Sequence, residues 1–178
     1  MQKSAACSDG TGFMPQLISR TNISFDPDKL TEAFEMVAGL QQQWHAVAVT
    51  SKPGVDNPLH DGIAANPDEE MLYNVINAEF RGTYFEEILT GLPFSFGRTR
   101  IMFIPPQKCY PVHTDHSIRY HLALDTNVGA LIVYPDAERV YHIPADGYLY
   151  KMDARFPHTA INCGPLTRAH MVIITDQQ

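Results

Sequence analysis

Three side chains that commonly bind metals, His113, Asp115 and His158, stand at a spacing that suits one shared site. In an extended strand, residues two positions apart point to the same face, so His113 and Asp115 would project together. His158 follows far enough along the chain to fold back beside this pair. Two histidines and one carboxylate that leave open positions on the metal suit non-haem Fe(II) oxygen chemistry. The spacing therefore predicts an iron site.

Arg168 stands ten residues after His158, inside an apolar strand pattern. A buried arginine without an anion is costly, so this position indicates that an anion fills the space beside it. The planar guanidinium can hold a carboxylate through two hydrogen bonds and keeps its proton at neutral pH. Arg168 is therefore predicted to bind a dicarboxylate co-substrate. The alternative is an ordinary charge on an edge strand.

The composition is that of an ordinary globular protein. The 178 residues are 44% hydrophobic and 19% charged, which predicts a single domain over 1–178 with a sizeable core. A formal net charge of −7 argues against a broad nucleic-acid surface, and no apolar run is long enough to span a membrane. Three cysteines without framework spacing, and an N-terminus without a signal-peptide pattern, predict a cytoplasmic protein. Nothing in the pattern indicates an oligomeric state.

The first half of the chain predicts two or three helices and two strands, because helix-starting pairs such as Asp26-Pro27 and Asn66-Pro67 precede apolar residues at helical spacing. Leu72 is expected on the buried face of the helix that Asn66 starts. Strands are expected over 17–25 and 44–50, helices from Asp26, from Asn66 and over 84–90, an irregular loop over 52–65, and a loose lead-in over 1–15.

The second half consists of short strand patterns separated by turn signals. Eight such patterns at near-regular spacing are typical of a sandwich or barrel. We therefore predict a mainly β (α+β) fold, a double-stranded β-helix or jelly roll with its core over 98–176 and the N-terminal helices packed on one sheet. The eight predicted strands cover 99–104, 110–115, 119–124, 130–134, 139–143, 148–152, 158–162 and 168–175.

Four motifs in this half allow a comparison with known families: His113-Thr114-Asp115, Arg119-Tyr120-His121-Leu122-Ala123-Leu124, the segment from His158 to Gly164, and the segment from Arg168 to Asp176. Together they resemble the Fe(II)/2-oxoglutarate-dependent oxygenase superfamily. Within it, the aspartyl/asparaginyl β-hydroxylase-like family, which includes free-proline cis-hydroxylases, is the most similar. The resemblance covers roughly residues 98–176 and extends to the helical half only in general character.

The resemblance implies that His113, Asp115 and His158 bind Fe(II) and that Arg168 holds 2-oxoglutarate, with Arg119 and His121 helping to hold it. It implies hydroxylation of a C–H bond by O₂, in a free amino acid or in an amino-acid side chain of a peptide, with succinate and CO₂ as co-products. Some animal members lack the carboxylate ligand, so Asp115 favours the small-molecule hydroxylases. Selectivity is expected to reside in 52–65, in 105–111 and in the first-half helices.

Other interpretations of the same residues stay open at this level. A cupin-like metalloenzyme could use the same ligands without 2-oxoglutarate, and a non-catalytic jelly-roll module could retain a vestigial site. His116 is a rival ligand, although in a strand it would point to the face opposite to that of His113. Arg119 could be a surface charge, and Asn162 could end a strand or support His158. His142 and His170 are expected to be packing or surface residues.

Overall fold

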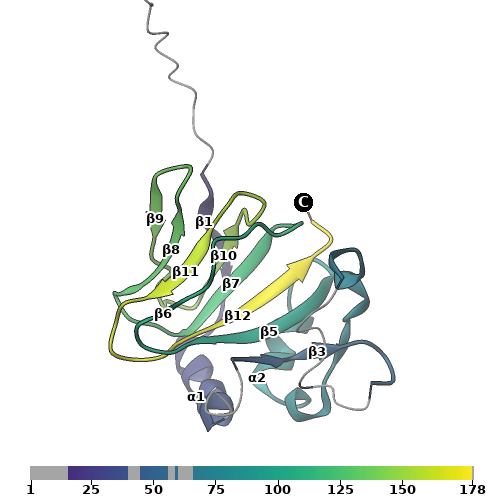
Figure 1. Ribbon diagram of the computed structural model, residues 1–178. Coiled ribbons are helices and arrows are strands. Elements are labelled where there is room, and N and C mark those ends of the chain that lie inside the picture. The colour runs from purple at the N-terminus through teal and green to yellow at the C-terminus, as the bar shows by residue number, and fades with distance from the viewer. Residues whose placement is uncertain (1–15, 40–44, 56–58, 60–65, 178) are drawn as a thin grey trace, which may run out of the picture.

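Two antiparallel sheets form the body of the protein, whose computed structural model describes residues 16–39, 45–55, 59 and 66–177 (Figure 1). The predicted jelly roll is confirmed. The larger sheet has the strand order β1 (Ile18–Ser24), β10 (Tyr148–Met152), β7 (Arg119–Asp125), β12 (Arg168–Thr175), β5 (Phe96–Ile104) and β2 (Ala46–Ala48). The smaller sheet has the order β6 (Lys108–Cys109), β11 (Thr159–Asn162), β8 (Ala130–Tyr134) and β9 (Arg139–Tyr141).

The helices α1 (Pro27–Ala38) and α2 (Tyr84–Thr90) pack on one face of the larger sheet, as predicted (Figure 1). The Asp26 side chain caps α1 by accepting hydrogen bonds from the N–H groups of Asp28 and Lys29. Apolar residues of both helices form the main core with alternate residues of the central strands, among them Ile101, Leu122 and Met171. Each such side chain contributes about 1.5–3 kcal/mol when it is fully buried.

The other face of the larger sheet is turned toward the smaller sheet and carries the polar side chains of interest. Neighbouring residues of a strand point to opposite faces, so the residues that alternate with the helix-facing core share this inner face. They are Arg100 and Met102 of β5, Arg119 and His121 of β7, and Arg168, His170 and Val172 of β12. The fold thus separates an apolar layer under the helices from a polar layer between the sheets.

The predicted strand over 110–115 is wrong. After β6, this segment runs antiparallel to 154–160 with only one isolated bridge, in which His113 and His158 exchange backbone hydrogen bonds of 3.0 and 2.9 Å. Outside the bridge, the Tyr110 N–H donates to the Ala160 carbonyl and the Asp115 N–H to the Ala154 carbonyl. The next hydrogen-bonded pair of a regular ladder would join Pro111 to Ala160, and Pro111 has no N–H to donate, so the ladder does not continue on that side of the bridge.

The helix predicted from Asn66 is a short 3₁₀ helix, η3 (Pro67–Leu72), rather than an α-helix. Asn66 caps it as expected, since its side chain accepts from the Asp68 N–H at 3.2 Å. Leu72, predicted to be buried, is 54% exposed, whereas Glu70 is buried. The chain leaves the helix at Leu72 because the following residues pair as β4 (Val75–Ile76) with β3 (Thr50–Ser51) before a second 3₁₀ helix, η4 (Ala78–Phe80).

The other predicted elements lie within a few residues of those observed, except that 44–50 contains two short strands instead of one. The lead-in over 1–15 and most of the loop over 52–65 lie outside the described residues. Within the part of the chain that the structure describes, no helix is both long and apolar enough to cross a membrane.

Candidate metal and co-substrate site

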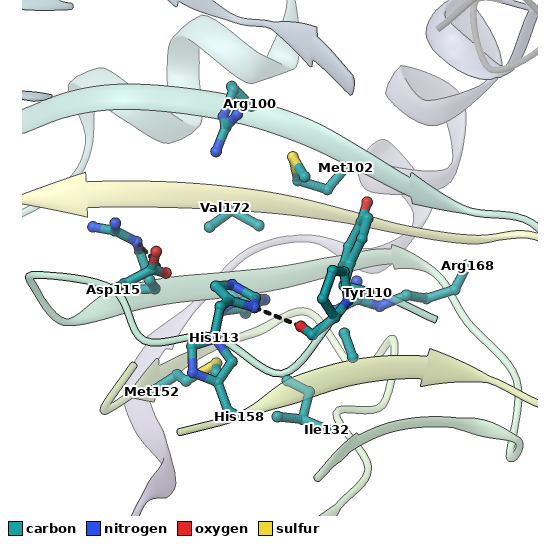
Figure 2. A pocket seen from close by; sticks show the side chains of 14 residues that line it. Arg100, Met102, Tyr110, His113, Asp115, Ile132, Met152, His158, Arg168 and Val172 are labelled. Carbon is teal, nitrogen blue, oxygen red and sulfur yellow. Dashed lines mark hydrogen bonds and ion pairs between the residues drawn. The ribbon is translucent and has the colours of Figure 1, made fainter. Parts of the chain in front are cut away.

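The three predicted metal ligands meet at one place. The ligand atoms of His113, Asp115 and His158 all lie within 4.8 Å of one another. The isolated bridge sets the two histidines side by side, and their ring centroids are 4.5 Å apart. Figure 2 shows the three side chains gathered at one end of a cavity. His113 is exposed and His158 is buried, so the cluster lies where this cavity opens.

Each of the two histidines is oriented by the carbonyl two residues before it. His113 Nδ1 lies 2.9 Å from the Pro111 oxygen, and His158 Nδ1 lies 2.9 Å from the Phe156 oxygen. A carbonyl can only accept, so both Nδ1 atoms carry the proton and both Nε2 atoms keep a free lone pair. This arrangement is the usual one for metal-binding histidines. Burial lowers the pKa of His158, which favours the neutral ring that a metal requires.

Asp115 is held as a carboxylate by Arg119. Burial raises the pKa of Asp115, but the charge and hydrogen bond of Arg119 outweigh it, and the net pKa is lowered. Arg119 Nε donates to Asp115 Oδ2 at 3.1 Å, which leaves Oδ1 without a hydrogen bond from the described residues. Two imidazole nitrogens and one carboxylate oxygen therefore face one another, and this donor set fits Fe(II).

A cavity of about 330 Å³ extends from the cluster between the two sheets. Its walls include Ile132, Met152 and Val172, which exclude water, and three arginines: Arg100, Arg119 and Arg168. Among the described residues, the helices contribute nothing to its lining, which contradicts the expectation that the first-half helices carry selectivity. The physical reason is that α1 and α2 pack on the opposite face of the larger sheet.

Arg168 lies at the buried end of this cavity. It is 3% exposed, and no described carboxylate forms an ion pair with it. Burial lowers its pKa to about 10, so it remains a cation at neutral pH. Its guanidinium donates to His170 Nδ1 at 2.7 Å. A buried cation without a carboxylate partner is costly unless an anion joins it.

His121 and His170 lie next to Arg168 as neutral rings. Burial and the positive charge of Arg168 lower the pKa of both histidines well below the usual range. His121 lines the cavity, as predicted for a residue that helps to hold the co-substrate. His170 is fully packed in the sheet, in line with its predicted packing role, and its Nε2 has no partner among the described atoms.

The sequence patterns do not single out two further candidate functional residues, Arg100 and Glu70. Arg100, on β5, lines the cavity and forms no ion pair with any described carboxylate. Burial lowers its pKa to about 10. Glu70, 4% exposed, accepts hydrogen bonds from Arg98 and Arg119. The arginines at alternate positions of β5 were a signal for Arg100, but nothing near Glu70 in the sequence points to its role.

The remaining sequence candidates lie outside the site. His116 is exposed and does not belong to the cluster. His142 is exposed on the side of the smaller sheet, where its ring lies 3.0 Å from the Ala130 carbonyl. Asn162 does not contact His158: its side chain bonds to the Ile104 and Leu166 carbonyls and to the Gly164 N–H, so it organises the turn after β11.

A sequence model of one enzyme family, aspartyl/asparaginyl β-hydroxylase, matches residues 83–177, which contain the cluster and Arg168. The chain belongs to this family. It is therefore a hydroxylase by family, and its cluster of two histidines and one carboxylate fits Fe(II). The family thus favours the first of the three interpretations over a cupin-like metalloenzyme or a non-catalytic module. Among curated proteins, none matches the sequence.

Solved structures share the fold at low sequence identity. AviO1 from Streptomyces viridochromogenes Tue57 has a TM-score of 0.52 at 14% identity, over 88% of this chain and 87% of that one. A prolyl hydroxylase from Trichoplax adhaerens, in complex with a hypoxia inducible factor oxygen degradation domain peptide fragment, has a TM-score of 0.51 at 16% identity, over 88% and 82%. The viral collagen prolyl hydroxylase from Paramecium Bursaria Chlorella virus-1, in its 2OG complex, has a TM-score of 0.50 at 8% identity, over 89% and 94%.

Proposed function

We propose that this enzyme hydroxylates a C–H bond of a free amino acid or of an amino-acid side chain, with His113, Asp115 and His158 as the Fe(II) ligands. One observation carries the proposal: the cluster stands at the open end of a cavity whose buried end holds Arg168, with which no carboxylate of the described residues forms an ion pair. When bound, iron, 2-oxoglutarate and O₂ supply the oxidant that converts C–H to C–OH, with succinate and CO₂ as co-products.

The chain's own residues bind and orient these groups. Arg168 binds the far carboxylate of 2-oxoglutarate, since its fork of N–H donors matches a carboxylate and its burial makes the bond strong. The neutral rings of His121 and His170 add no competing charge beside it. The apolar side chains of Ile132, Met152 and Val172 keep water from the path between the two ends.

Arg100 supports a substrate that carries a carboxylate. In the larger sheet Arg100 pairs with Val172 of β12, which lies four residues after Arg168, or about 13 Å along an extended strand. Val172 in turn pairs with His121 of β7. Arg100 and Arg168 thus enter the cavity at different points of its wall, as Figure 2 shows, and are suited to two separate anions. We assign the second anion to the α-carboxylate of a free amino acid.

A turnover assay tests this proposal. Succinate formation from 2-oxoglutarate is measured with free L-amino acids, with their amides, and with short peptides that contain the same residues. We expect stimulation by at least one free amino acid and not by its amide. Arg100→Gln should lower the specificity constant for that amino acid about 10- to 100-fold, since one charged hydrogen-bond pair is lost.

Arg139→Gln, at an exposed position on β9, is the matched control and should leave turnover unchanged. Equal stimulation by the amide would contradict the role of Arg100. Stimulation by peptides alone would assign the reaction to side chains within a peptide. Undiminished succinate formation by Arg168→Gln would contradict the proposed co-substrate site itself.

A further inference from the structure

Glu70 forms a bidentate ion pair with Arg119, the arginine that also donates to the proposed ligand Asp115. Glu70 Oε2 accepts from Arg119 Nη1 at 2.9 Å, and Oε1 accepts from Nη2 at 3.0 Å. Both side chains are about 5% exposed. A bidentate pair of this kind fixes the guanidinium plane as well as its position. Arg98 also donates to Glu70, so two arginines neutralise the two carboxylates Glu70 and Asp115.

The remaining N–H groups of Arg119 are turned toward the segment that carries Asp115. Nε donates to Asp115 Oδ2, and Nη1 donates to the hydroxyl of Ser117 as well as to Glu70. All three nitrogens of Arg119 therefore have protein partners. Although Arg119 lines the cavity, it forms ion pairs with Asp115 and Glu70, whereas none of the carboxylates that the structure describes pairs with Arg168.

Asp115 needs support of this kind because its backbone is weakly tied. It lies between the isolated His113–His158 bridge and the first residue of β7, in a stretch without regular strand pairing. Within the described part of the chain, its backbone forms one hydrogen bond, from its N–H to the Ala154 carbonyl at 2.8 Å. The direction of its carboxylate is therefore set by Arg119, which donates to Oδ2 and holds a carboxylate oxygen within 4.8 Å of the ligand nitrogens of the two histidines.

We infer that Glu70 is a positioning residue for the metal site: it clamps Arg119, and Arg119 aims the Asp115 carboxylate at the ion. The chain's resemblance to its family assigned Arg119 to the co-substrate, whereas these contacts assign it to a ligand of the metal. This inference rests on the proposed iron ligands. It predicts that Glu70 controls metal affinity and leaves 2-oxoglutarate affinity to Arg168.

The test measures binding to the full-length apo-protein without turnover. Co(II) titrated by calorimetry, in the absence of 2-oxoglutarate, gives the metal dissociation constant. The variants are Glu70→Gln, which keeps the side-chain shape, and Glu69→Gln as a matched control. Glu69 lies on the same η3 helix but pairs with Lys52 at the partly exposed surface. We expect Glu70→Gln to weaken Co(II) binding about 10- to 100-fold, as for other supporting residues of metal sites, and Glu69→Gln to have no effect.

Two further variants separate positioning from simple loss of stability. If Glu70 acts through Arg119, the double variant Glu70→Gln/Arg119→Gln binds Co(II) no more weakly than Arg119→Gln alone. At saturating Co(II), the 2-oxoglutarate dissociation constant of Glu70→Gln should stay within about twofold of wild type, a range well below the ~10-fold change that one lost charged contact causes.

Unchanged Co(II) affinity in Glu70→Gln, or additive losses in the double variant, would overturn the inference. So would a loss of 2-oxoglutarate affinity at saturating metal. The variant His113→Ala distinguishes this failure from that of the proposed function. If His113→Ala binds Co(II) like wild type, the proposed ligands themselves are wrong.

Discussion

At the scale of single residues, the site is defined by which atoms already have partners. The Nδ1 atoms of His113 and His158 are bound to carbonyls, and Asp115 Oδ2 is bound to Arg119. One ligand atom each of His113, Asp115 and His158 lies within 4.8 Å of the other two, at one end of the cavity. Arg168 lies at the buried end, where its nearest polar partner is the ring of His170. The proposed cation site and the carboxylate site at Arg168 thus lie at opposite ends of one cavity, and Arg100 lines the wall as a second candidate for an anion.

Replacing Arg168 tests the anion end of the site. Arg168→Gln should raise the 2-oxoglutarate dissociation constant about 100-fold, because one buried charged contact contributes about 1.5–3 kcal/mol. Arg168→Lys keeps the charge but loses the planar guanidinium, so its 2-oxoglutarate dissociation constant should lie between those of wild type and Arg168→Gln. The measurement is 2-oxoglutarate titration of the Co(II)-loaded protein. Wild-type affinity in Arg168→Gln would show that the co-substrate binds elsewhere.

The buried His170 predicts a pH-dependent stability. Burial and Arg168 lower the pKa of His170 in the folded protein, whereas an unfolded histidine has a pKa of about 6.5. Below that pH the unfolded chain takes up a proton that the folded chain does not, so the free energy of unfolding falls as pH falls. His170→Asn keeps an acceptor for Arg168 and should remove up to about 1.4 kcal/mol of the loss between pH 7.5 and 5.5. Urea unfolding of wild type and His170→Asn at the two pH values measures the loss of unfolding free energy. Equal losses in the two proteins would contradict a lowered pKa of His170.

At the scale of elements, short irregular segments position the site and regular strands support it. The segment over 110–115 carries two of the three proposed ligands, yet it pairs with its neighbour through a single bridge. η3 contributes one buried carboxylate from a six-residue 3₁₀ helix. The long strands β5, β7 and β12 supply the three cavity arginines at fixed register. The strands of the larger sheet therefore position the three arginines, and the irregular segment over 110–115 positions two of the proposed metal ligands.

The sequence was informative where chemistry is local and uninformative where it depends on distant contacts. That His113, Asp115 and His158 lie together could be predicted, because His113 and Asp115 stand two positions apart on an extended segment and His158 follows far enough along the chain to fold back beside them. The role of Glu70 could not be predicted, because its partner Arg119 lies 49 residues away and its acidic neighbours suggested only a helix start. The 110–115 segment is predicted as a strand, but it forms one isolated bridge instead of a ladder. His113 and Asp115 nevertheless lie together in one cluster with His158, as expected for an extended segment.

Replacing Asn162 tests the role of a single turn, since its side chain bonds to the turn after β11 and not to the proposed metal ligands. Its buried side chain bonds to the Ile104 carbonyl at 2.8 Å and to the Leu166 carbonyl at 2.7 Å. Asn162→Ala removes a donor from the buried Ile104 carbonyl, whereas the Leu166 carbonyl keeps its hydrogen bond from Asn127, so the free energy of unfolding should fall by about 1–3 kcal/mol. Chemical denaturation measures the loss. Co(II) affinity should not change, and a parallel loss of metal binding would show that Asn162 supports His158 after all.

At the scale of the whole molecule, the apolar core and the site occupy different layers. The helices cover one face of the larger sheet (Figure 1) and enclose the main core with it. The cavity is lined by residues of the other face. The fold therefore does not require the metal. Removal of metal by a chelator should leave the far-ultraviolet circular dichroism unchanged. Adding Co(II) and 2-oxoglutarate at 100 times their dissociation constants should each stabilise the fold by about 2.7 kcal/mol. Unfolding on chelation would contradict this separation of layers.

The most direct test of the central claim is an anaerobic titration of the apo-protein with Fe(II) and 2-oxoglutarate, followed by visible absorption. If His113, Asp115 and His158 bind iron and Arg168 places 2-oxoglutarate on it, wild type will show the weak charge-transfer band of the chelate. His113→Ala will show none, and Arg168→Gln will need far more 2-oxoglutarate to develop it. Absence of the band in wild type, or a full band in His113→Ala, would contradict the proposed site.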